Sequence, residues 1–272
     1  MIITRDSIAR ARSVLAVPGH RPDRFVKAVH SGADSVMLDL EDAVGPDLKS
    51  AARKNISDWL ESGGEGIVRI NGVETPWYEK DVEMLAGRRC AVVLPKVTSP
   101  LQIELLLRRL AEGSFVIALL ETAAGILGAR EICATPGVVR AIFGNGDLAS
   151  ELGIDLADHV SMSHARSQIV LASAAGGLVP PLDGLTIAIT DDQKLKLDAQ
   201  HSVAMGFTGK VCIHPRQIHT VHEIFTPSST ELQWAREALA ASHDGSVAVL
   251  NGKLVGTPML ERARRLLSQW EA

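Results

Sequence analysis

The sequence predicts a (β/α)8 barrel, or TIM barrel, and two observations lead to that fold. Short apolar runs rich in β-forming residues alternate with helix-like segments along most of the chain. Such runs are typical of parallel strands that are buried on both faces. Eight strand and helix pairs fit into about 225 residues, which is close to the usual size of this barrel. A doubly wound sheet fits that number of pairs less well.

The elements follow from the apolar runs and from the turn-forming residues between them. We expect the first four strands over residues 13–17, 35–40, 66–71 and 90–96, the fifth and sixth from Phe115 and Val138, and the last two over 184–189 and 209–215. Helices are expected over 21–31, 49–60 and 77–86, and another begins at Ser99-Pro100. Further helical segments are expected after the fifth strand, through much of 148–176, and between the seventh strand and Met205.

The pattern changes beyond Pro227. A helix over residues 229–242 precedes apolar runs on both sides of Asn251-Gly252, which is a strong signal for a β-hairpin, and a last helix covers 257–270. We therefore divide the chain into a catalytic barrel domain, residues 1–225, and a C-terminal helix-hairpin-helix segment, residues 226–272. This segment is too small to bury its own apolar faces, so we expect either a lid or an oligomerisation arm.

Composition excludes several classes of protein. The chain has 272 residues, a formal net charge of −4, and 28 Lys and Arg against 32 Asp and Glu. No basic patch is visible that could neutralise nucleic-acid phosphates. No apolar run approaches the ~20 residues that span a bilayer, and no signal peptide is recognisable, so we expect a cytoplasmic protein. Three widely spaced cysteines predict buried thiols and no disulfide framework.

Charged and polar residues gather at the C-terminal ends of the expected strands, where barrel enzymes build their active sites. They are Asp39, Glu41, Arg69, Lys96, Glu121, Asp147 and His214. Glu121 and Asp147 end adjacent strands, and two carboxylates with few other ligands suit Mg2+. The alternative is that the two carboxylates are the acid and base of a glycosidase. Glycosidase sites usually have aromatic side chains against the sugar, and only 4% of the residues here are aromatic, so we discount this alternative. The guanidinium of Arg69 is suited to donate two parallel hydrogen bonds to a substrate carboxylate. A metal and an arginine together favour chemistry on an oxo or hydroxy acid.

Seven motifs in order resemble the citrate lyase beta-subunit-like (CitE-like) acyl-CoA lyases of the HpcH/HpaI aldolase superfamily, over nearly the whole chain. They are RSVLAVPG with RP (12–22), DLEDAV (39–44), RIN (69–71), LPK (94–96), ETAAGI (121–126), FGNGDLA (143–149) and IHPRQ (213–217). The resemblance implies a Mg2+-dependent barrel, commonly a homotrimer, that cleaves or forms a carbon-carbon bond in a 3-hydroxyacyl-CoA such as citryl-, malyl- or citramalyl-CoA.

The resemblance also implies roles for single residues. Glu121 and Asp147 would be the metal ligands, and Arg69 would bind the oxo-acid carboxylate and act in catalysis. The other assignments are Glu41 and Asp42 as catalytic residues, and Asp39, Lys96, Gly146 and Leu148 as substrate-binding residues. The implied partners are an acyl-CoA thioester and an oxo acid.

Two positions depart from the family pattern. Relatives usually carry an aspartate in the hairpin that follows the extra helix, and a neighbouring subunit uses it as the acid-base group at the acetyl-CoA methyl. The residue here is Gly256. Relatives also place an acid at the position of Ala188. Loss of a positioned general base costs about 10²- to 10⁴-fold in rate.

Three interpretations therefore stay open. The chain is a lyase in which Asp42 or a water replaces the missing acid, or it is a lyase or aldolase on a substrate that is not an acetyl-CoA adduct. The third is a catalytically silenced subunit that binds CoA or an oxo acid and needs a partner, such as an acyl-carrier protein.

Overall fold

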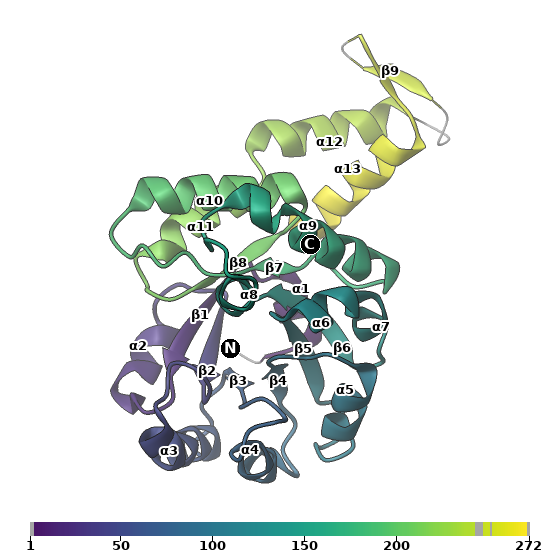
Figure 1. Cartoon of the computed structure of the whole chain (residues 1–272). Helices are drawn as coiled ribbons and strands as arrows, with labels where there is room; N and C mark the ends of the chain where they lie inside the picture. Colours follow the sequence, from purple (N-terminus) through teal and green to yellow (C-terminus); the bar gives the residue numbers. More distant parts are fainter. Residues whose placement is uncertain (1–2, 243–246, 251, 271–272) are drawn as a thin grey trace. The chain divides into compact units, whose positions relative to one another are not determined.

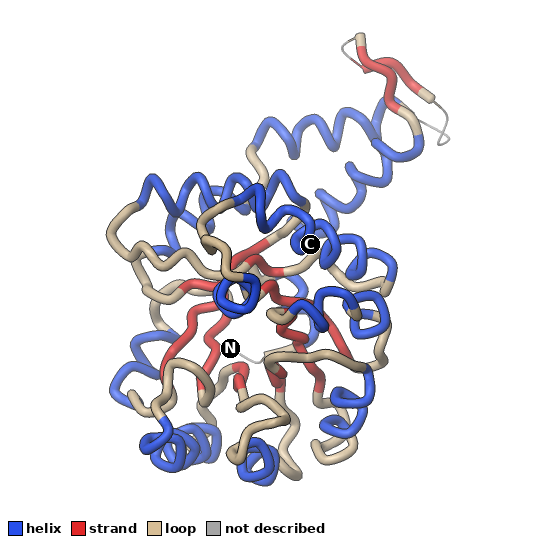
Figure 2. The backbone as a smooth tube through the Cα atoms, in the orientation of Figure 1, coloured by secondary structure: helices blue, strands red, loops and turns tan. Residues whose placement is uncertain are grey.

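The computed structural model describes residues 3–242, 247–250 and 252–270, and within them eight parallel strands close into a barrel with helices around it (Figures 1 and 2). Each strand pairs with the next one along the chain, and β8 pairs with β1. The predicted (β/α)8 barrel is confirmed. The strands are β1 (Ser13–Pro18), β2 (Ser35–Asp39), β3 (Ile67–Arg69), β4 (Ala91–Leu94), β5 (Phe115–Leu120), β6 (Val138–Phe143), β7 (Leu182–Asp183) and β8 (Gly209–Cys212).

The helices of the barrel unit follow the strands in the expected alternation. They are α2 (Phe25–Val29), α3 (Lys49–Glu61), α4 (Tyr78–Leu85), α5 (Pro100–Leu107), α6 (Ala123–Leu127), α7 (Ala129–Cys133), α8 (Asn145–Leu152), α9 (His159–Ala175), α10 (Asp192–Met205) and α11 (Gln217–Phe225). A further helix, α1 (Arg5–Arg10), precedes β1 and was not expected. It has a capping box between Thr4 and Ser7, but it is too short to show a helical period.

The seventh strand differs from its prediction. It covers Leu182–Asp183, whereas the apolar run that was expected to form it, residues 184–189, is a loop beyond the strand. The reason is a side chain that takes over the backbone pairing: Asn145 donates to the carbonyl of Leu185 and accepts from its amide, each at 3.0 Å. The strand ladder therefore ends at Asp183, and the loop belongs to the rim of the barrel.

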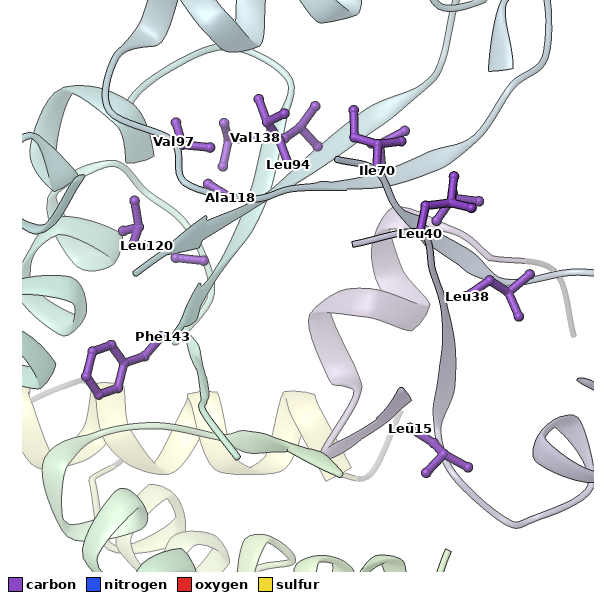
Figure 3. Close-up of a cluster of buried hydrophobic side chains, with 14 of the residues drawn as sticks. Leu15, Leu38, Leu40, Ile70, Leu94, Val97, Ala118, Leu120, Val138 and Phe143 are labelled. Atoms are coloured by element: carbon purple, nitrogen blue, oxygen red, sulfur yellow. The ribbon is translucent and has the colours of Figure 1, made fainter. Parts of the chain in front are cut away.

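Two apolar layers hold the barrel together, and β5 shows how the sequence builds both. Alternate residues of a strand point to opposite faces. Phe115, Ile117 and Leu119 belong to a cluster that fills the barrel interior. Their neighbours Val116, Ala118 and Leu120 belong to the larger cluster between the strands and the helices, part of which Figure 3 shows. All six side chains are buried, so the strand is apolar along its whole length.

The chain divides into two compact units, one up to Phe225 and one from Thr226. The second unit contains α12 (Ser229–Ala241), β9 (Ala248–Leu250), β10 (Lys253–Val255) and α13 (Thr257–Trp270). The two strands pair antiparallel, as the predicted hairpin requires, although Asn251 of the turn lies outside the described residues. A small apolar cluster of its own contains Ala235, Ala238, Val255, Leu260 and Ala263.

In the described part of the chain, no helix is long and apolar enough to cross a membrane.

Candidate active site

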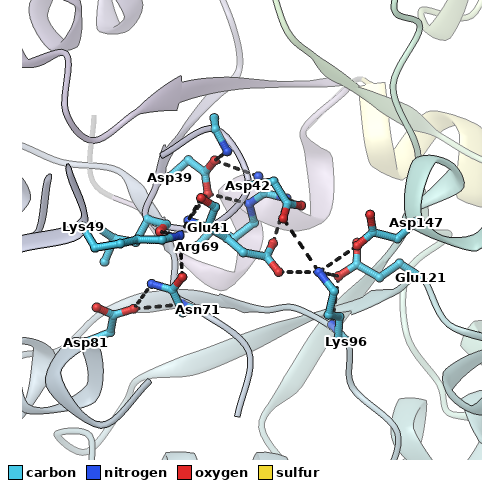
Figure 4. A network of polar contacts seen from close by, with 12 residues as sticks. Asp39, Glu41, Asp42, Lys49, Arg69, Asn71, Asp81, Lys96, Glu121 and Asp147 are labelled. Carbon is cyan, nitrogen blue, oxygen red and sulfur yellow. Dashed lines mark hydrogen bonds and ion pairs between the residues drawn. The ribbon is translucent and has the colours of Figure 1, made fainter. Parts of the chain in front are cut away.

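Asp39 and Arg69 form the base of a polar network at the C-terminal ends of the strands (Figure 4). They are the last residues of β2 and β3, and they are register partners. Nε of Arg69 donates to Oδ1 of Asp39 at 2.6 Å, and Nη2 donates to Oδ2 at 2.7 Å. Burial acts to raise the pKa of Asp39, but the charge and hydrogen bonds of Arg69 outweigh it and hold that pKa below its ordinary value. The pair fixes the guanidinium plane.

Glu41 and Asp42 follow β2 and lie on the other side of the same guanidinium. Nη1 of Arg69 is 3.2 Å from Oε2 of Glu41 and 3.7 Å from Oδ2 of Asp42. The side chain of Glu41 is only 6% exposed, whereas that of Asp42 is 56% exposed. Burial raises the pKa of Glu41 to about 7. Of the two acids, Asp42 therefore faces the solvent and Glu41 is held inside the network.

Lys96 and Glu121 come from the next two strand ends. The backbone amide of Lys96 donates to Oε1 of Glu121 at 2.9 Å. The ammonium of Lys96 lies 2.7 Å from Oε1 of Glu41 and 4.0 Å from Oε1 of Glu121. Glu121 is almost fully buried, and burial together with the nearby charge of Glu41 raises its pKa to about 8.

Asp147 is supplied by a helix that follows β6. It lies in the first turn of α8, where the helix dipole favours a negative charge. Oδ2 of Asp147 is 2.7 Å from Nζ of Lys96, so Lys96 bridges Asp147 and Glu41. Asn145, the first residue of α8, ties this helix to Leu185 in the loop after β7.

Three further residues support the network, and the sequence interpretation did not assign them. The buried ammonium of Lys49 donates to the carbonyls of Leu40 and Glu41 and to Oδ1 of Asn71, at 2.7–2.8 Å. Asn71 in turn donates to Asp81 through its backbone and its side chain. One signal was available: Lys49 occupies the buried stripe of α3 together with Ala52 and Ile56, and a lysine in such a stripe needs partners.

The network borders a solvent-open pocket of about 470 Å³. Polar groups of Asp42, Arg69, Glu121, Gly146 and Asp147 line it, and its apolar wall includes Met37, Leu119, Ile142 and Val211 from the barrel interior. The structure thus brings the predicted metal and substrate residues of five strand ends to one place. Their roles stay predictions.

Two predicted residues, Glu41 and Lys96, belong to the network but are not among the described residues that line the pocket. Three others take other positions. The side chain of Asp39 is fully buried, so it positions Arg69 rather than facing the pocket. Leu148 is buried in the cluster between the strands and the helices, because it lies on the inner face of α8, and its side chain does not line the pocket. His214 accepts a hydrogen bond from the amide of Arg216 and is also absent from the pocket lining among the described residues.

The donor set fits Mg2+. Oδ2 of Asp147 and Oε2 of Glu41 are buried and have no well-directed hydrogen bond, and the carboxylates around the pocket outnumber the cations. Hard oxygen donors of this kind, one or two per ion with substrate oxygens and water completing the shell, are what Mg2+ prefers. Among the described residues, no group of three His, Cys, Asp or Glu side chains forms a ready-made metal cage.

Gly144 gives the first testable consequence of this geometry. A Cβ at this position would overlap Cβ of Glu121 and lie 2.7 Å from its Oε2. We expect Gly144→Ala to displace the carboxylate, to weaken Mg2+ binding at least about tenfold, and to lower the free energy of unfolding by about 1–3 kcal/mol. Isothermal titration with Mg2+ and chemical unfolding measure the two effects.

Gly45→Ala is the matched control for this substitution. Gly45 is not among the described residues that line the pocket, and a Cβ there would meet no heavy atom within 4 Å. Mg2+ binding in this variant should equal that of the native protein. Native Mg2+ affinity in Gly144→Ala would contradict the role given to Glu121.

Comparison with known proteins places this geometry in a family. The family model described as HpcH/HpaI aldolase/citrate lyase matches residues 12–215. The chain is 36% identical to a (3S)-malyl-CoA thioesterase of Cereibacter sphaeroides, over 96% of this chain and 95% of that protein. It is 39% identical to a citrate lyase subunit beta-like protein of Mycobacterium tuberculosis, over 93% of each.

A solved structure agrees with these relatives. CitE of Mycobacterium tuberculosis, in complex with magnesium, acetoacetate and coenzyme A, aligns with a TM-score of 0.83 and 37% identity, over 96% of this chain and 98% of the other. The family match, the curated relatives and the solved structure therefore agree with the motifs and the barrel: this chain belongs to the HpcH/HpaI aldolase/citrate lyase family and is CitE-like.

Proposed function

We propose that the protein is a Mg2+-dependent carbon-carbon lyase that cleaves a 3-hydroxyacyl-CoA of the citryl-, malyl- or citramalyl-CoA type to an acyl-CoA and an oxo acid. The observation that carries the proposal is the convergence of Glu121, Asp147 and Arg69 on one pocket. The relative with a bound oxo acid, magnesium and coenzyme A supports it. Glu121 and Asp147 would hold Mg2+, which supplies a Lewis acid for the oxygen on which charge develops.

The other residues of the pocket have separate tasks in this proposal. Arg69 binds the carboxylate that becomes part of the oxo acid, because it lines the pocket while Asp39 holds its Nε and Nη2. The buried Asp39 keeps the guanidinium from turning. Cleavage then needs a base that takes the proton of the 3-hydroxyl group while the C2–C3 bond breaks, and an acid that gives a proton to C2 of the departing thioester.

Asp42 is the acid-base candidate that this chain offers. It lines the pocket, its side chain is 56% exposed, and it lies beside Arg69. Glu41 is the second candidate, since burial raises its pKa to about 7, which is near the pH at which a general acid works best. In this proposal either group acts as a less efficient substitute for the carboxylate that the family carries at the position of Gly256.

The test is an assay of the purified protein with Mg2+ against citramalyl-, malyl- and citryl-CoA, in which the oxo acid and the free thiol are followed separately. Oxo-acid release without free thiol is the result we expect. Absence of both products with all three substrates would reject the lyase proposal in this form. A silenced binding subunit would then be distinguished by Mg2+-dependent binding of pyruvate or oxaloacetate without turnover.

A second candidate function is hydrolysis of the thioester. Gly256 favours it, because hydrolysis breaks the C–S bond and needs no proton transfer at the methyl carbon, and a relative of 36% identity is named a (3S)-malyl-CoA thioesterase. The same assay separates the two functions. Free thiol at the rate of substrate loss, without oxo acid, would indicate the thioesterase.

The resemblance to the family also leads us to propose a cytoplasmic homotrimer in which residues 226–272 form a lid or an oligomerisation arm. Sedimentation equilibrium of the full chain tests the trimer. A monomer would contradict a lid that serves a neighbouring subunit.

A further inference from the structure

Lys96 has a position that neither the family resemblance nor a role in substrate binding explains. Its ammonium is surrounded by four carboxylates from three segments of the barrel rim (Figure 4). It lies 2.7 Å from Glu41 and from Asp147, and the next two carboxylates, Asp42 and Glu121, lie at 3.9 and 4.0 Å. A single cation therefore touches one of the proposed metal ligands and lies beside the other.

The backbone is strained to achieve this arrangement. Within the described residues, Lys96 is the only non-glycine residue with a positive φ, of 52°. This left-handed conformation is disfavoured for a residue with a side chain. In that conformation the amide of Lys96 binds Oε1 of Glu121 while its side chain reaches Oδ2 of Asp147. The turn after β4 thus connects Lys96 to both proposed ligands of the cation.

Charge and mobility complete the argument. Arg69 is engaged by the fully buried Asp39 through two hydrogen bonds, so the ammonium of Lys96 is the nearest positive charge to Asp147 and Glu121 among the described residues. Unlike Arg69, whose side chain is 13% exposed, Lys96 is 40% exposed. A lysine has a compact charge on a flexible stem, so it can leave Asp147 without unpacking the barrel.

We propose that Lys96 is a tethered counter-ion that sets the affinity of the site for its divalent cation. The ammonium and the cation compete for the same carboxylates, so Lys96 weakens metal binding and keeps the ion exchangeable when no substrate is present. The inference rests on the proposed function, because it takes Glu121 and Asp147 as the metal ligands. Lys96 is a positioning residue in this scheme and no bond changes at its nitrogen.

The experiment is a titration of substrate-free protein with Mg2+ by calorimetry and with Mn2+ by electron paramagnetic resonance. The neutral variants Lys96→Met and Lys96→Gln should each bind the ions about tenfold more tightly than the native protein, because a like charge next to the ion is removed. Lys96→Arg keeps the charge and should stay close to the native affinity. Lys54→Met is the control for net charge alone, since the side chain of Lys54 is 74% exposed on α3.

The outcomes separate this inference from the function on which it rests. Unchanged or weaker ion binding in both neutral variants, with native circular dichroism, would overturn the role of Lys96. Glu121→Ala is titrated alongside. Native affinity in Glu121→Ala, or no ion binding by the native protein, would reject the metal assignment itself, and the proposal for Lys96 would fail with it.

Discussion

Alanine at Glu121 or at Asp147 should remove Mg2+ binding and Mg2+-dependent turnover while the barrel stays folded. Each variant deletes one of the two proposed ligands, and both of these residues line the pocket. Changes in the shell around a metal cost about 10- to 100-fold in affinity, so loss of a ligand should cost more than about 100-fold. Turnover at saturating substrate and Mn2+ binding measured by electron paramagnetic resonance report the two losses independently.

A matched control lies at the other end of the same strand. Glu112 precedes β5 and is exposed, whereas Glu121 follows β5 and is buried. Glu112→Gln removes one negative charge without touching the pocket, and it should bind Mg2+ as the native protein does. Mg2+-dependent turnover that survives in either alanine variant would disprove the assignment of that residue as a ligand.

Aspartate at position 256 should raise the rate of carbon-carbon cleavage by about 10²- to 10⁴-fold, which is the usual contribution of a positioned acid or base. The local structure accepts the substitution. A Cβ at Gly256 would meet Pro258 and Val247 at no less than 4.0 Å, which is ordinary contact, and the φ of Gly256 lies outside the range that disfavours a side chain. Gly256→Asp therefore tests the chemistry of the missing acid without disturbing the fold.

Gly256→Asn is the control for this variant, since asparagine has nearly the same shape but transfers no proton at neutral pH. Oxo-acid release from citramalyl-, malyl- or citryl-CoA should rise in the aspartate variant alone. Equal rates in the native protein and in Gly256→Asp would mean that a group such as Asp42 already performs the proton transfer. Equal gains in both variants would point to a shape effect at the hairpin.

The alternation of apolar runs and helical segments was enough to predict the barrel, because a buried parallel strand must be apolar on both faces and β5 is so along its whole length. The same alternation placed Arg69 and Glu121 at one rim, since all parallel strands end on the same side. It did not place β7, because the pairing of Leu185 with the side chain of Asn145 is a contact between segments that are 40 residues apart.

Contacts between distant segments also account for what the sequence left open at the candidate site. Spacing along the chain cannot tell that Asp39 is fully buried beneath Arg69, that Lys49 reaches Asn71, or that Lys96 lies between Glu41 and Asp147. These arrangements depend on which strand ends become neighbours and on how far each side chain extends. A one-dimensional pattern thus specifies the strands, the rim and the residue types that meet there, while burial, pairing and pKa come from the three-dimensional packing of those residues.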